Sequence, residues 1–496
     1  MSGVSPSMPS HVPSESLFTP PVLLRETLAG IVTALALIPE VISFSFISGV
    51  DPKSALTASI VLCLALSALG GRPAMVTAAA GSVALVIGPM VQAHGTGYIL
   101  PTVLLAGVIQ IGFGLAGMAR ITRFIPRSVM IGFVNALGIL IFAAQVPHVL
   151  HASPAVLGLF ALTVAIVLGA PRLTSAVPAP LIAIVATTAL AVFFGLAVPE
   201  VGGEGHMAPG LPGLTRLTVP LTLDTLAIIW PSALSVAFVG LLETLLTAKL
   251  VDEITDTPSR KGRESWALGV GNILAGFWGG IAGCAMIGQT VVNVRIGGAR
   301  TRLSTLVAGL SMLLLVTVLA GVMARIPLVA LAAVMMIVAI RTVNWHSVRP
   351  ATLRRMPLPE TSVMVATVAL TVATGNLALG VGGGVLLAMI LFARRLAHVI
   401  SVEREPGPDG ASVRYHVRGP LFFGSSNDLF EHFAYAEDPT RVTIDLSQSQ
   451  IWDASSVAAL DSIIDRFKAH GAEVTLEGLD ARSRTFHGRL TGALGG

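Results

Sequence analysis

The chain carries the apolar run Leu35-Ala36-Leu37-Ile38-Pro39-Glu40-Val41-Ile42-Ser43-Phe44, in which one acid stands among hydrocarbon side chains. A second run, Phe238-Val239-Gly240-Leu241-Leu242-Glu243-Thr244-Leu245-Leu246, contains one acid in the same way. About 40 residues after each acid comes a short segment of small residues, Ala80-Gly81-Ser82 in the first case and Gly283-Cys284-Ala285 in the second. This internal repeat predicts one acid and one short helix per half inside a membrane, which is how a secondary transporter builds a central site.

The composition is that of a membrane protein. Only 12% of the 496 residues are charged, and the mean hydropathy is +0.81, whereas soluble domains carry about twice that charge. Long apolar runs recur over the first ~400 positions, each long enough to cross about 30 Å of hydrocarbon. Basic residues fall in the short loops between these runs and aromatic residues are few, so nucleic-acid binding is not expected. The two cysteines, Cys63 and Cys284, lie in apolar segments without metal-ligand spacing.

Hydropathy predicts about 14 membrane segments. The third and tenth are short and interrupted by glycine, so we interpret them as half-helices that stop at the midplane. With the N-terminus inside, arginine and lysine concentrate in the inner loops, as the positive-inside rule requires. Seven segments per repeat make the two repeats inverted. The predicted segments are 25–47, 55–70, 74–91, 98–118, 126–146, 155–170, 179–198, 226–250, 264–282, 284–295, 303–324, 327–341, 360–375 and 377–398.

Regions of different composition flank the predicted transport domain, residues 23–400. Residues 1–22 are rich in Ser and Pro and lack the features of a signal peptide, which predicts a disordered cytoplasmic tail. From residue 403 onward the charge content is ordinary. Alternation in Arg441–Leu446 and helical spacing from Val457 to Phe467 predict a small α/β domain over 403–496. Its expected role is regulation, folding support or dimer contact.

Glu40 is the first candidate for ion coupling. A carboxyl group in hydrocarbon is costly unless it is protonated or paired. Pro39 has no N–H, so a carbonyl in the preceding turn lacks its usual donor. This combination suits a carboxyl that gains and loses a proton. The alternative is a permanent hydrogen bond from Glu40 to a neighbouring helix.

Glu243 and Thr247 form the second candidate. Their i, i+4 spacing places both side chains on one helix face. A carboxylate and a hydroxyl together can coordinate Na⁺ or position a proton carrier. The alternative is a carboxylate that is simply hydrogen-bonded by the threonine.

The two half-helices predict an anion site. A helix N-terminus exposes unpaired N–H groups and carries about half a positive charge. Two such termini meeting at the midplane attract an anion without lysine or arginine. The alternative is that the small residues only permit close helix packing. The predicted solute-binding residues are Phe44 as a wall, Gly81, Ser82 and Val83 at the first half-helix, and Ala285, Met286, Ile287, Gly288 and Gln289 at the second.

No other chemistry is indicated by the sequence. There is no phosphate-binding Walker loop, so ATP-driven transport is not expected. No nucleophile–base pair and no metal-ligand cluster occur within the predicted spans, so an enzyme is not expected and no cofactor is predicted.

Several motifs resemble the SulP family of anion transporters, the sulfate permeases, whose relatives include prestin and pendrin. The resemblance covers nearly the whole chain, and Trp452–Asp461 is similar to the family's STAS domain. It implies a core of spans 1–4 and 8–11, a gate of spans 5–7 and 12–14, elevator-like movement and a homodimer. Family solutes include sulfate, bicarbonate, chloride, oxalate and dicarboxylates. The motifs are Gly240–Leu245, Gly271–Gly280, Gly283–Asn293 and Gly297–Thr301.

Two positions depart from the family pattern. Animal members have an arginine where this chain has Gln289, and Ala454 follows Asp453 where related STAS domains have a phosphorylated serine. Without the fixed positive charge, coupling to a cation is favoured over chloride exchange. At Ala454 no phosphorylation switch is expected.

These observations together predict a multi-pass transporter of a bacterial inner membrane, with both termini cytoplasmic. We expect proton-coupled symport of a small carboxylate or dicarboxylate. The alternatives are Na⁺-coupled symport of bicarbonate or sulfate, an uncoupled anion conductor, or a membrane-anchored interaction protein acting through its STAS domain. Expected partners are the anion, H⁺ or Na⁺, membrane lipid and a second copy of the chain.

Overall fold

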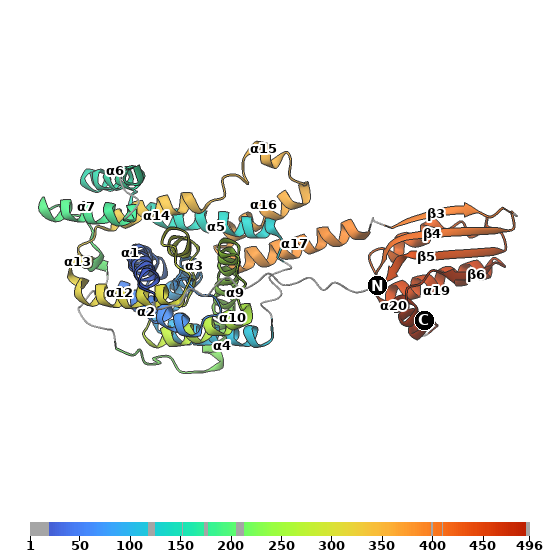
Figure 1. The fold of residues 1–496 in the computed structure, drawn as a ribbon, viewed down its shortest axis with the longest axis horizontal. Helices are drawn as coiled ribbons and strands as arrows, with labels where there is room; N and C mark the ends of the chain where they lie inside the picture. The colour runs from blue at the N-terminus through green and yellow to red at the C-terminus, as the bar shows by residue number, and fades with distance from the viewer. Residues whose placement is uncertain are drawn as a thin grey trace. The chain divides into compact units, whose positions relative to one another are not determined.

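The computed structural model describes residues 19–117, 125–150, 152–172, 177–204, 213–397, 400–408 and 410–492. The chain forms two compact units, Met1–Val385 and Leu386–Gly496. The first unit is helical. The second contains a four-stranded sheet with helices (Figure 1).

The chain has seven membrane segments in each repeat, as predicted, and the last of them, Leu377–Ala397, runs from the first unit into the second. In hydrocarbon every backbone N–H and C=O must bond within its own segment, so apolar runs of this length become helices. The first repeat contains α1 (Pro20–Ser48), α2 (Pro52–Leu69), α3 (Gly81–His94), α4 (Ile99–Leu115), α5 (Arg127–Gln145), α6 (Pro154–Gly169) and α7 (Ala179–Phe193). The second contains α9 (Leu223–Thr255), α10 (Lys261–Phe277), α11 (Ile287–Val291), α12 (Arg302–Val318), α14 (Leu328–Thr342), α16 (Leu358–Thr374) and α17 (Leu377–Ala397).

Short helices occupy several connections. A π-helix, Val292–Ile296, directly continues α11. Three α-helices of four or five residues lie between membrane segments, namely α8 (Val201–Glu204), α13 (Ala320–Ala324) and α15 (Pro350–Leu353).

The first helix begins earlier than predicted. Thr19 is its N-cap residue, and Pro20 and Pro21 occupy the first two helical positions, where a missing N–H costs nothing. Pro20–Val22 therefore belong to α1 and not to the tail that was predicted over residues 1–22. Residues 1–18 lie outside the described part of the chain.

The helices of the first unit form core and gate subdomains. In the core, α1 packs on α2, α3 and α12, α10 packs on α2 and α4, and α9 packs on α3 and α4. In the gate, α5 packs on α14 and α16, and α6 packs on α7 and α14. Figure 1 shows α1, α3 and α9 between α14 and α5 on one side and α2, α10 and α12 on the other. The two subdomains meet where α1 contacts α14 and α7, and where α3 contacts α5.

Both half-helices are preceded by a short strand that the sequence did not predict. Strand β1 (Thr77–Ala79) pairs antiparallel with β2 (Gly283–Ala285), with Ala78 opposite Cys284. A Cβ on Gly283 would lie 2.1 Å from the Ala78 carbonyl oxygen, so only glycine permits this pairing. Ala285, predicted to open the second half-helix, is the last residue of β2, and α11 begins at Ile287.

The second unit is an α/β domain whose sheet has the order β3-β4-β5-β6. The first pair is antiparallel and the other two pairs are parallel. The domain begins at Ser401, two residues before the predicted start, because β3 pairs with β4 from that residue onward. Its strands are β3 (Ser401–Pro406), β4 (Ser412–Leu421), β5 (Arg441–Ile451) and β6 (Glu473–Glu477), and its helices are α18 (Ser426–Leu429), α19 (Ala454–Ala469) and α20 (Ala481–Leu490).

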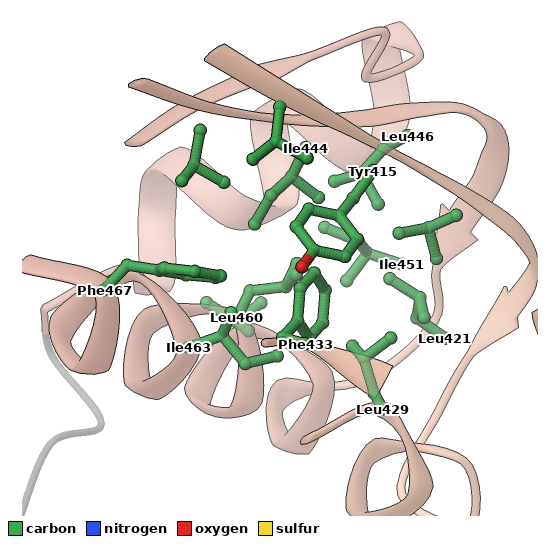
Figure 2. Close-up of a cluster of buried hydrophobic side chains, with 14 of the residues drawn as sticks. Tyr415, Leu421, Leu429, Phe433, Ile444, Leu446, Ile451, Leu460, Ile463 and Phe467 are labelled. Carbon is green, nitrogen blue, oxygen red and sulfur yellow. The ribbon is translucent and has the colours of Figure 1, made fainter. Parts of the chain in front are cut away.

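One apolar core holds this domain together. Tyr415 of β4 is fully buried, and its ring lies 4.7 Å from that of Phe433 and 6.2 Å from that of Phe467, centre to centre (Figure 2). Asp453 caps α19 by accepting the Ser456 N–H at 3.0 Å. Ala454 is the exposed first residue of that helix.

Candidate functional site

The outer edge of β2 is hydrogen-bonded by side chains from α9 and α10. Asn272 accepts the Gly283 N–H at 2.7 Å and donates to the Gly283 carbonyl at 3.2 Å. Thr244 accepts the Ala285 N–H at 3.0 Å, and the Thr247 hydroxyl donates to the Ala285 carbonyl at 3.0 Å. These four bonds replace the second neighbouring strand that β2 lacks.

Helix α2 does the same for β1. The Ala79 N–H donates to the Ser59 hydroxyl at 3.0 Å, and the Cys63 thiol donates to the Thr77 carbonyl at 3.1 Å. An unpaired backbone group in a dry interior costs several kcal/mol. The two-stranded ribbon is therefore held in one position by helices of both repeats.

The ribbon brings the N-termini of the two half-helices together. Helix α3 begins at Gly81 and α11 at Ile287, each shortly after its strand, and neither N-cap residue forms a side-chain cap. The first N–H groups of a helix lack intrahelical partners and carry partial positive charge. Each strand thus leads into one such helix end, and an anion site between the two ends stays a prediction.

The two ends differ in their surroundings. A Cβ on Gly81 would lie 2.6 Å from the Phe44 ring, so Phe44 packs directly against the start of α3. A Cβ on Gly288 would meet nothing within 4 Å, and Gly288 is exposed. Ser82, Val83, Ala285, Met286 and Gln289 are buried, whereas Ile287 is half-buried. The open space therefore lies on the α11 side.

Glu40 is a half-buried residue of α1. Leu24, Leu28 and Ile31 are exposed at helical spacing, and the five residues after Glu40 are buried. The Gln289 side chain lies within hydrogen-bonding reach of the Glu40 carboxyl. The first-repeat acid thus adjoins the second half-helix.

Glu243 is in a closed environment. It is 7% exposed. Its Oε2 atom accepts from the Ser82 hydroxyl at 2.5 Å and from the Cys284 thiol at 3.1 Å. These donors belong to α3 and to β2, the strand before α11. One carboxyl of α9 therefore joins the two half-helix arms, by which we mean β1 with α3 and β2 with α11.

Thr247 shares a helix face with Glu243, as predicted, but its hydroxyl has different partners. It donates to the backbone carbonyls of Glu243, at 2.8 Å, and of Ala285. The alternative of a carboxylate bonded by this threonine is therefore wrong. Coordination of Na⁺ at Glu243 and Thr247 stays a prediction.

Sequence reasoning missed the residues that hold the ribbon. Each is a polar or thiol residue within an apolar span, which is itself a signal of function in membranes. Their roles could not be assigned because the strands they bond were not predicted. They are Ser59, Cys63, Thr244, Asn272 and Cys284, together with Gln110, which accepts from Asn272 at 2.8 Å.

Comparison with known proteins decides the family. Residues 23–156 and 148–367 match the model of the sulfate permease family, and residues 400–487 match the STAS domain. The chain belongs to the sulfate permease family. Like the family's other members it is a multi-pass membrane protein that transports anions and is not an enzyme.

Curated relatives carry the names of two anions. The chain is 46% identical to "Putative sulfate transporter YbaR" of Bacillus subtilis, over 93% of this chain and 95% of that protein. It is 25% identical to the bicarbonate transporter BicA of Picosynechococcus, over 92% of this chain and 88% of that protein.

Solved structures share the fold. Murine Slc26a9 in its inward-facing state matches with a TM-score of 0.81 at 15% identity, covering 94% of this chain and 87% of that one. The transmembrane domain of a cyanobacterial BicA matches with a TM-score of 0.65 at 25% identity, covering 72% and 97%.

Proposed function

We propose that this sulfate permease family member is a proton-coupled symporter, with Glu40 as the proton carrier. The solute is a small anion held between α3 and α11, and a carboxylate or dicarboxylate is the first class to test. The observation that carries the proposal is the position of Glu40. It is half-buried and lies beside Gln289 of the second half-helix.

Charge neutralisation supplies the coupling. An anion bound at the two helix ends adds negative charge to the core, and a charged core is costly to move past an apolar surface. The gate presents such a surface, because every residue from Leu328 to Ile337 in α14 is hydrophobic and buried. If Glu40 takes up a proton as the anion binds, the loaded core crosses more readily than the half-loaded one.

Glu243 has a second role in this proposal. Its bonds to Ser82 and Cys284 connect the two arms of the site. The separate packing of core and gate helices supports an elevator-like movement in which the core, with these arms fixed, slides as one body against the gate.

A second candidate is Na⁺-coupled symport of bicarbonate or sulfate. The names of the relatives favour these two solutes. The Thr247 hydroxyl lies within hydrogen-bonding distance of the Glu243 and Ala285 backbone carbonyls, and oxygens grouped in this way suit a hard cation such as Na⁺. In this reading Glu243 replaces Glu40 as the coupling acid.

We infer the cellular setting from the same relatives. The proposal places the chain in a bacterial inner membrane with both termini in the cytoplasm, as a homodimer with a regulatory STAS domain. Cross-linking of the full-length protein in membranes tests the dimer. A monomer at every cross-linker concentration contradicts it.

Uptake into proteoliposomes tests the function. Labelled fumarate, bicarbonate and sulfate are each supplied with an inward proton gradient, an inward Na⁺ gradient, or neither. Proton-driven accumulation that is lost in Glu40→Gln supports the proposal. Accumulation driven by Na⁺ alone transfers the coupling role to Glu243 and Thr247. Equilibration without accumulation identifies an uncoupled conductor.

A further inference from the structure

We propose that two buried carboxylates, Glu26 and Glu264, are positioning residues that clamp the loops of the two half-helices and so fix where their N-termini lie. The inference rests on the proposed solute site between α3 and α11. Neither acid belongs to that site, and neither was singled out by its sequence context.

Glu264 clamps the loop that leads into β1 and α3. It lies in the first turn of α10 and is 1% exposed. Its Oε2 atom accepts from the backbone N–H of Gly71 and, at 2.9 Å, from that of Arg72. In return the Arg260 N–H donates to the Gly71 carbonyl at 3.2 Å. The loop is thus bonded on both sides to the start of α10.

Glu26 clamps the loop that follows α11 and its π-helix. It lies in α1 and is fully buried. Its carboxylate accepts from the backbone N–H of Arg300 at 2.8 Å and from that of Thr301 at 3.3 Å. Two consecutive N–H groups on one carboxylate is the arrangement seen at Glu264, and such charge-assisted bonds are stronger than neutral ones.

Close backbone contact accompanies both clamps. A Cβ on Gly71 would lie 2.2 Å from the Arg260 carbonyl oxygen, and a Cβ on Gly297 would lie 2.5 Å from the Cβ atom of Ala29. No side chain fits at either position without movement of the loop. The glycines let each loop approach the helix that carries its clamp.

The arginine side chains add further bonds at the same places. Arg72 pairs with Asp252 at 3.1 Å and donates to the Thr257 carbonyl at 2.8 Å. Arg300 donates to the carbonyl of Val294 in the π-helix, at 2.7 Å, and to that of Ala299 in the following loop, at 2.8 Å. In each loop the residue whose N–H is clamped is therefore also fixed by its side chain.

Each clamp crosses between the repeats. The loop of α3, in the first repeat, is held by Glu264 of the second, and the loop of α11, in the second repeat, is held by Glu26 of the first. The N–H groups that face a solute must be fixed to within a fraction of an ångström for tight binding. Loosening either clamp lets one helix end move relative to the other, which weakens solute binding without changing any solute contact.

Conservative variants of the full-length protein test whether Glu26 and Glu264 fix the positions of the half-helix N-termini. Glu26→Gln and Glu264→Gln keep the side-chain size and remove the charge. Glu253→Gln is the matched control, because Glu253 is a 64% exposed acid of α9 paired only with Lys249 at 4.0 Å among the described residues. We expect KM to rise about tenfold in each clamp variant, with kcat per folded protein within twofold, and no change in the control. The solute is whichever of sulfate, fumarate and bicarbonate the wild type takes up fastest.

Hydrogen exchange gives a readout that needs no transported solute. In Glu264→Gln we expect faster exchange at residues 81–84, and in Glu26→Gln at residues 287–290, beyond the loops themselves. Faster exchange confined to residues 70–72 and 298–301, or an unchanged KM with a lower kcat, means a local structural role and overturns the proposal. If wild-type uptake does not depend on the proton gradient, the proposed proton coupling is wrong. The KM and hydrogen-exchange measurements still test the roles of Glu26 and Glu264 in that case.

Discussion

The two acids that look equivalent in the sequence have opposite environments in the fold. Glu40 is half-buried and adjoins the amide side chain of Gln289. Glu243 is buried and accepts from a hydroxyl and a thiol that belong to different half-helix arms. A carboxyl that exchanges protons needs a path to water, and Glu40 has the better access. A carboxyl that joins structural elements needs donors on both, which Glu243 has.

The comparison shows that an inverted repeat need not give its two halves the same role. The helix ends are also unequal, but with the repeats exchanged, because Phe44 covers Gly81 of the first repeat while Gly288 of the second faces open space. Glu243 and the start of α3 therefore mainly hold the site in position, whereas Glu40 and the start of α11 leave room for the solute.

Removing Glu243 has the largest expected effect. Glu243→Ala leaves the Ser82 and Cys284 donors without their acceptor in a dry interior, at about 1–3 kcal/mol each, and opens a cavity. We expect a fall in thermal stability of several degrees and loss of transport, measured by fluorescence-detected unfolding and uptake. Glu40→Ala is the control and should unfold within about 2 °C of wild type. Equal losses for the two variants would remove the distinction between them.

The glycines at the two helix ends give a matched pair. Gly81→Ala drives a methyl group into the Phe44 ring, so we expect destabilisation of about 1–3 kcal/mol. Gly288→Ala meets no atom and improves helix propensity, so stability should be kept or slightly raised. Because its methyl enters the open space, KM should rise several-fold. Unfolding and uptake kinetics measured on both variants check this, and a Gly288→Ala variant with wild-type KM would place the solute elsewhere.

The variant Thr247→Val tests whether Thr247 of α9 has a structural role or binds the coupling ion. The variant keeps the shape and loses the donor to the Ala285 and Glu243 carbonyls, so we expect a stability loss of about 1 kcal/mol. Proton-driven uptake should persist with a changed rate. If wild-type uptake requires Na⁺ and Thr247→Val loses that requirement, then the coupling ion binds at α9 and Glu40 is not the coupling acid.

The smallest expected effect is on the stability of the STAS domain. There Glu405, His416 and Asp445 form a solvent-accessible cluster of two carboxylates and one histidine. The His416 ring donates to the Glu405 carboxylate, at 2.8 Å, and to the Asp445 carboxylate, and these two hydrogen bonds raise the pKa of His416 above its usual 6.5. Charged His416 therefore stabilises the folded domain fully below pH 6.5, and this contribution is lost as pH rises through the raised pKa. Protection of β4 amides, corrected for intrinsic exchange, should fall slightly more between pH 6 and 8.5 in wild type than in His416→Gln. An identical fall in both would show that the cluster does not affect stability.

The sequence was sufficient for the fold class and for the arms of the site. Hydropathy indicates spans because hydrocarbon demands internally bonded helices, and paired acids and glycines mark the repeat. The strands β1 and β2 were not predictable, because three residues such as Thr77–Ala79 have no detectable alternation. The partners of Glu243 could not be predicted either, since Ser82 and Cys284 are distant in sequence and meet only through that strand pairing. Nor does local sequence distinguish the half-buried Glu40 from the buried Glu243.

Proton movement measured together with solute uptake tests the central claim most directly. Proteoliposomes loaded with a pH-sensitive dye receive the transported anion without any imposed proton gradient. The account predicts that solute entry acidifies the lumen in wild type, and that Glu40→Gln lets solute equilibrate with no acidification. Solute-dependent acidification that persists in Glu40→Gln would contradict Glu40 as the proton carrier.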